Sequence, residues 1–126
     1  MTAPAIDRRR LRAISAGEPE LAVELVDALI EDAVPLVTSI ADLAEHHSSD
    51  DLGFAAHALK GIAGNIGATQ LHEAAAELEA ATREADCDWA EIRVHVNGVR
   101  DALDGVRALR VTISEPGRLQ SCFADA

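Results

Sequence analysis

The chain has 126 residues, a formal net charge of −11 at pH 7 and only 2% aromatic residues, with no tyrosine. That length suits one domain with its own hydrophobic core, and the scarcity of aromatic side chains favours helices over sheets. The negative charge argues against binding to a nucleic-acid backbone, because phosphate contacts need dense lysine and arginine.

The N-terminal third predicts a short helix followed by a long one. A basic helix or turn over residues 6–15 ends at Gly17, and Pro19 suits the first turn of the next helix. The first long helix is expected over residues 20–45, with a kink at Pro35, because the apolar period resumes on both sides of the proline. Its expected core stripe is Leu21, Leu25, Leu29, Leu36, Ile40 and Leu43.

Three further helices follow, each after a polar break. The second bundle helix starts after "HHSSDD", the third is expected over residues 69–85, and the fourth starts at a capping box formed by Asp88 and Glu91. Four amphipathic helices with short connections predict an all-α fold, an antiparallel four-helix bundle preceded by a short N-terminal helix. We expect the domain to span residues 1–110, and residues 111–126 to form a C-terminal extension that is disordered or frayed.

The second bundle helix carries two stripes of different character. An apolar stripe predicts its core face: Leu52, Ala55, Ala56, Leu59, Ile62, Ala63 and Ile66. A second stripe lies on the opposite side, with His57 about 200° around the helix from Leu59 at 100° per residue. It consists of His57, Lys60, Gly61, Gly64 and Gly67.

These small and polar residues indicate an accessible histidine beside a cleared surface. A glycine inside a helix costs about 1 kcal/mol relative to alanine, so three of them suggest that another molecule approaches the backbone there. A neutral imidazole is a good nucleophile near pH 7, and an ammonium group one turn away can neutralise a phosphoryl group on the ring. Lys60 is the single lysine of the chain, beside ten arginines. The pattern therefore favours phosphoryl transfer through His57.

The segment "AAHALKGIAGNIGATQLHEAAAELEAA" resembles the signature of histidine-containing phosphotransfer (HPt) domains of two-component phosphorelays. The preceding helix, "GEPELAVELVDALIEDAVPLVTSI", is similar to the family's first bundle helix, and the resemblance covers roughly residues 6–109. It implies that a receiver-domain aspartyl-phosphate phosphorylates His57 on Nε2 and that the group passes to another receiver aspartate. Lys60 would stabilise the phosphoryl group, and Gly61, Gly64, Asn65 and Gly67 would form the receiver-binding surface.

The resemblance also implies the cofactors and partners. The chain is expected to be a phosphoryl carrier rather than an enzyme, without a nucleotide or metal of its own, Mg²⁺ coming with the partner receiver. The implied partners are response-regulator receiver domains and a hybrid histidine kinase, and we expect a monomer. One residue departs from the family pattern: a gapless count puts Glu79 where many members have a Gln that binds the imidazole Nδ1. We expect the Glu79 carboxylate to orient the ring.

Several alternatives remain open from the residues. One alternative is a bundle that docks a receiver without accepting phosphate. Another is the phosphorylated domain of a chemotaxis-type kinase, although the initial Met and the lack of a kinase core favour a stand-alone protein. A metal or haem site is not expected, because no Glu-x-x-His pair occurs. The remaining histidines are expected at the surface: His46, His47, His72 and His95.

The cellular location is inferred from what the sequence lacks. Cys87 and Cys122 form no metal-binding or redox spacing, which is typical of reduced cytosolic thiols. The N-terminus "MTAPAIDRRRLR" has no apolar run of signal-peptide length, and no segment is long and apolar enough to span a membrane. We therefore expect a cytoplasmic protein without membrane contact.

Overall fold

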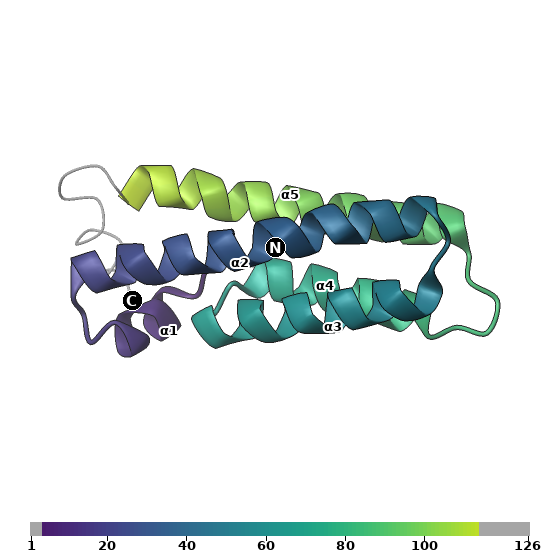
Figure 1. Ribbon diagram of the computed structural model, residues 1–126. Helices are drawn as coiled ribbons and strands as arrows, with labels where there is room; N and C mark the ends of the chain where they lie inside the picture. The colour runs from purple at the N-terminus through teal and green to yellow at the C-terminus, as the bar shows by residue number, and fades with distance from the viewer. Residues whose placement is uncertain (1–3, 114–126) are drawn as a thin grey trace.

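The computed structural model describes residues 4–113, and within them all regular secondary structure is helical (Figure 1). The helices are α1 (Arg8–Ile14), α2 (Pro19–Glu45), α3 (Ser49–Ile66), α4 (Thr69–Thr82) and α5 (Trp89–Ile113). This confirms the all-α prediction for the described part of the chain.

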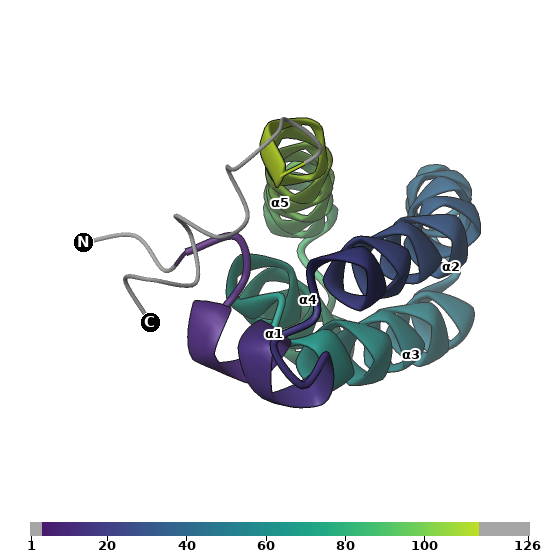
Figure 2. The ribbon, with the colours of Figure 1, turned by 90° about the vertical axis from the view of Figure 1, so that its left-hand side faces the viewer.

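The four longer helices pack around one hydrophobic core. Each contacts two neighbours, in the order α2, α3, α4, α5 and back to α2. Figure 1 shows successive helices running in opposite directions, and the end-on view in Figure 2 shows α1 lying across the end of the bundle. The core is built from leucine, valine, isoleucine and alanine, and the alanines let the helices approach closely.

Helix α2 is continuous through Pro35, as the sequence predicted, and Pro35 is exposed to solvent. The predicted core stripe was wrong in part. The residues of α2 that are buried are Ala22, Val26, Leu29, Ala33, Val37 and Ile40. Leu21 and Leu25 remain partly exposed beside this stripe. The buried stripe begins one position after each of these leucines, at Ala22 and Val26, so Leu21 and Leu25 flank the interface instead of filling it.

The turn between α3 and α4 has the geometry of a helix C-cap. Gly67 has φ of +82°, and the Ala68 N–H donates to the Ala63 carbonyl at 2.9 Å, the long bond of a Schellman motif. Helix α1 covers this turn, because the Asp7 N–H donates to the Gly67 carbonyl at 2.7 Å. Arg10 also donates to the Asn65 carbonyl from Nε at 3.3 Å and from Nη2 at 3.2 Å.

Helix α5 starts and ends near its predicted bounds. The Asp88 carboxylate accepts from the Ala90 and Glu91 N–H groups at 3.0 and 3.2 Å, which is the N-cap half of the predicted capping box. The helix continues to Ile113 rather than ending at Arg110, because the buried Ile113 lies two turns after Val106 on the core face. The helix therefore runs three residues beyond its predicted end, and the rest of the predicted extension, 114–126, lies outside the described residues, as does Cys122.

No helix within residues 4–113 is both long enough and apolar enough to cross a bilayer.

Candidate functional site

His57 lies in the middle of α3 on the side that faces solvent. Its side chain is 64% exposed, whereas Leu59, two residues later, is fully buried. Lys60, one turn further along the helix, is 29% exposed. The helical wheel thus separated the polar stripe from the core stripe as the structure does.

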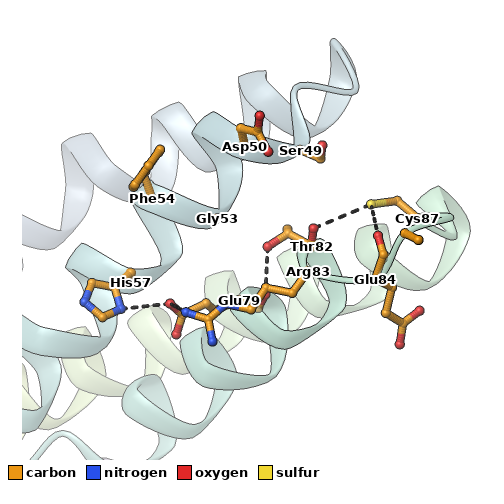
Figure 3. Close-up of a pocket in the computed structure, with 11 residues that line it drawn as sticks. Ser49, Asp50, Gly53, Phe54, His57, Glu79, Thr82, Arg83, Glu84 and Cys87 are labelled. Carbon is orange, nitrogen blue, oxygen red and sulfur yellow. Dashed lines mark hydrogen bonds and ion pairs between the residues drawn. The ribbon is translucent and has the colours of Figure 1, made fainter.

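The partner of His57 is a buried carboxylate on the neighbouring helix. Glu79 projects from α4 with 6% of its side chain exposed, and its Oε2 lies 2.8 Å from His57 Nδ1 (Figure 3). Lys60 Nζ donates to Oε1 of the same carboxylate at 2.7 Å, and Arg83 Nη2 donates to Oε2 at 2.9 Å. Glu79 therefore connects three polar side chains from two helices.

These contacts decide the charge of Glu79. The hydrogen bond from Lys60 lowers the pKa of Glu79 most, with smaller contributions from the His57 bond and the charges of Arg83 and Lys60, and burial opposes them without reversing the result. Glu79 is consequently ionised at neutral pH. An ionised carboxylate only accepts hydrogen bonds, so the proton of a neutral His57 ring is on Nδ1 and the lone pair on Nε2.

The three glycines of the polar stripe have different surroundings and different structural roles. A side chain at Gly61 would meet nothing within 4 Å, so this position is open surface. A Cβ at Gly64 would lie 3.2 Å from Nδ1 of the His72 ring on α4. Gly67 ends the helix with a positive φ, and a Cβ there would lie 2.8 Å from Arg10. Gly67 is therefore needed for the turn and for α1, which the sequence interpretation of one continuous strip missed.

Asn65, the remaining residue predicted to bind a partner, is exposed near the end of α3. Its backbone carbonyl is occupied by Arg10, so α1 holds the last turn of α3 in place.

A groove of about 690 Å³ runs beside His57 between the first half of α3 and the end of α4 (Figure 3). Phe54, one turn before His57, is 76% exposed at its edge. The helices approach closely at Gly53, where a Cβ would lie 2.8 Å from the Thr82 hydroxyl. Sequence reasoning missed Phe54 and Arg83. The i,i+4 spacing of Glu79 and Arg83 was the signal that would have found the second of them.

Among the other histidines, His47, His72 and His95 have different neighbours. The described residues contain no group of three or more His, Cys, Asp or Glu side chains that could hold a metal ion. His47 stacks on Trp89 with ring centroids 4.3 Å apart, and His72 Nδ1 lies 3.0 Å from the Lys60 carbonyl. His95, 22% exposed, lies near the carboxylates of Glu77 and Glu91.

Comparison with protein families identifies the family to which the chain belongs. Residues 24–109 match the Hpt domain, which covers α3 and α4 completely together with most of α2 and α5. The chain belongs to the Hpt domain family, whose members are phosphotransfer carriers of two-component systems and interact with receiver domains or kinases. Searches of curated proteins and of solved structures found no match.

Proposed function

We propose that this protein carries a phosphoryl group on Nε2 of His57, taking it from the aspartyl-phosphate of a receiver domain and passing it to another receiver aspartate. The observation that carries the proposal is the 2.8 Å contact between His57 Nδ1 and the buried Glu79 carboxylate. Because this contact engages Nδ1, it leaves Nε2 as the nucleophilic nitrogen of an exposed ring.

The transfer is a displacement at phosphorus. The Nε2 lone pair forms a bond to phosphorus while the bond from phosphorus to the aspartyl oxygen breaks, and the carboxylate of the receiver leaves with that electron pair. The ring then bears Nε2–P and Nδ1–H and is a cation, which the Glu79 carboxylate stabilises. The reverse displacement by a second receiver aspartate restores the neutral ring.

The chain's own contribution is positioning and charge. Glu79 orients the ring, and Lys60 supplies a mobile positive charge for the phosphoryl oxygens. The open backbone at Gly61 and the exposed Phe54 flank His57 on α3, and we assign them to the surface that a receiver covers. Gly64 and Asn65 extend this surface along α3. The domain works as a monomer, needs no cofactor of its own and relies on Mg²⁺ bound by the receiver.

Phosphotransfer in solution tests the proposal. The protein is incubated with a radiolabelled phosphorylated receiver and Mg²⁺, and the label on the domain is measured. We expect an acid-labile, base-stable label on the wild type and none on His57→Gln. A wild type that binds the receiver but acquires no label would make the chain a docking adaptor, and a label that persists in His57→Gln would move the acceptor elsewhere.

A further inference from the structure

Two cationic side chains contact the single negative charge of the Glu79 carboxylate. Lys60 on α3 and Arg83 on the next turn of α4 both donate to it, so two permanent cations surround one anion in addition to the His57 ring. Either cation alone would balance the carboxylate. The second one needs a separate explanation.

The simplest explanation for Arg83 is an ordinary surface ion pair. Its side chain is 73% exposed, and exposed i,i+4 pairs contribute little to stability. The acceptor differs from that of an ordinary surface pair, because Glu79 is buried and Arg83 donates to Oε2, the oxygen that lies on His57 Nδ1. Arg83 is thus joined to the imidazole through one oxygen atom.

The second cation, Arg83, can stabilise Glu79 when a phosphoryl group is transferred to His57. That group brings up to two negative charges to the exposed edge of the ring, and Lys60 is the flexible cation one turn away. Lys60 Nζ lies 2.7 Å from Glu79 Oε1 in the present structure, so turning it toward the phosphoryl oxygens weakens its bond to the carboxylate. A buried carboxylate is destabilised when a cation leaves it before another takes its place, because its desolvation is then less compensated, and the His57 ring becomes a cation only once the bond to phosphorus has formed. Arg83 is in place to prevent this.

We propose that Arg83 is a positioning residue for phosphotransfer, which keeps the Glu79 carboxylate balanced while Lys60 moves from Glu79 to the phosphoryl group on His57. The inference rests on the proposed function, since it presumes that His57 is the acceptor. In it, Arg83 touches neither the phosphoryl group nor the receiver and acts through Glu79.

A double-mutant cycle tests the path through Glu79. The rate of label transfer from a phosphorylated receiver is measured for the wild type, Arg83→Gln, Glu79→Gln and the double variant. We expect Arg83→Gln to slow transfer by roughly five- to tenfold in the wild type, within the range found for groups in one hydrogen-bonded network. In the Glu79→Gln background the same change should alter the rate by less than about twofold, because no carboxylate is left to balance.

Two single variants serve as controls. Arg107→Gln removes the same charge from an exposed position on α5 and should leave the rate unchanged, which separates local balance from the net charge of the domain. Arg83→Lys keeps a cation within reach of Glu79 and should restore most of the rate. A fold-change that is equal in both Glu79 backgrounds would overturn the proposal and indicate direct contact between Arg83 and the receiver.

A second measurement does not depend on transfer. The pKa of Glu79, followed by NMR of its carboxyl carbon in the unphosphorylated protein, should rise in Arg83→Gln and stay constant in Arg107→Gln. An unchanged pKa in Arg83→Gln overturns the inference even if the wild type is labelled. A wild type that acquires no label at all, by contrast, refutes the proposed function itself.

Discussion

Replacing Glu79 by glutamine removes the charge of the carboxylate and keeps the size and shape of the side chain. The amide oxygen of Gln can still accept from His57 Nδ1, whereas the ionic character of the bonds from Lys60 and Arg83 is lost. A hydrogen bond to a charged group contributes about 1.5–3 kcal/mol and a neutral one about 1 kcal/mol. The bond from the Lys60 ammonium to an amide oxygen lies between these limits, so the Lys60 contact loses up to about 2 kcal/mol. The exposed Arg83 pair adds about 0.3–0.5 kcal/mol.

The expected destabilisation at pH 7 is therefore about 1–2 kcal/mol, or about 4–8 °C in Tm for a domain of this size. The folded-state pKa of Glu79 lies below its unfolded-state value, so this stabilisation is complete above the unfolded-state pKa. It is lost as the pH falls through the folded-state pKa. The wild type and Glu79→Gln should consequently converge in stability once the pH has fallen below the folded-state pKa of Glu79.

Urea unfolding followed by circular dichroism, at pH 7 and in the acid range, measures both effects. Glu77→Gln is the matched control, because the same substitution on an exposed carboxylate of α4 should change the free energy of unfolding by less than about 0.5 kcal/mol. If Glu79→Gln were as stable as the wild type at pH 7 and showed the same pH dependence, the reasoning about an ionised carboxylate held by two cations would be refuted.

Three further outcomes are expected. Gly61→Ala should raise the free energy of unfolding by about 0.5–1 kcal/mol in thermal or urea unfolding, because an added Cβ meets open space, and should slow transfer to His57 if a receiver packs there. Gly67→Ala should lower stability by at least about 1 kcal/mol, since the new Cβ combines a positive φ with a collision against Arg10; an unchanged Tm would contradict this. Phe54→Ala should leave Tm within a few degrees of the wild type but weaken receiver binding in calorimetry, and equal affinities would remove Phe54 from the docking surface.

Periodicity and punctuation were sufficient to predict most of the fold. The all-α class, the continuity of α2 through Pro35 and the Asp88 cap of α5 follow from local rules that depend on neighbouring residues only. The end of α4 was placed three residues too late, because "TREAD" continues the helical period while the chain already leaves the helix at Thr82. Helix ends are where local signals are weakest.

The candidate site was likewise predictable from the sequence only in part. The sequence by itself determined that His57 and Lys60 share the solvent side of a helix, because a 3.6-residue period leaves no other choice once Leu59 faces the core. The gapless count also named Glu79, and the structure brings its carboxylate to the imidazole, while its role in transfer stays a prediction.

Only the tertiary structure decided what each of these residues contacts. The glycines after His57 look alike in sequence, yet Gly61 faces open space, Gly64 lies against the His72 ring of α4, and Gly67 makes the turn under α1. The convergence of Lys60 and Arg83 on one carboxylate was likewise decided by packing. A helical period fixes the direction in which a side chain leaves its own helix, but which atoms it meets depends on how the neighbouring helices are placed against it.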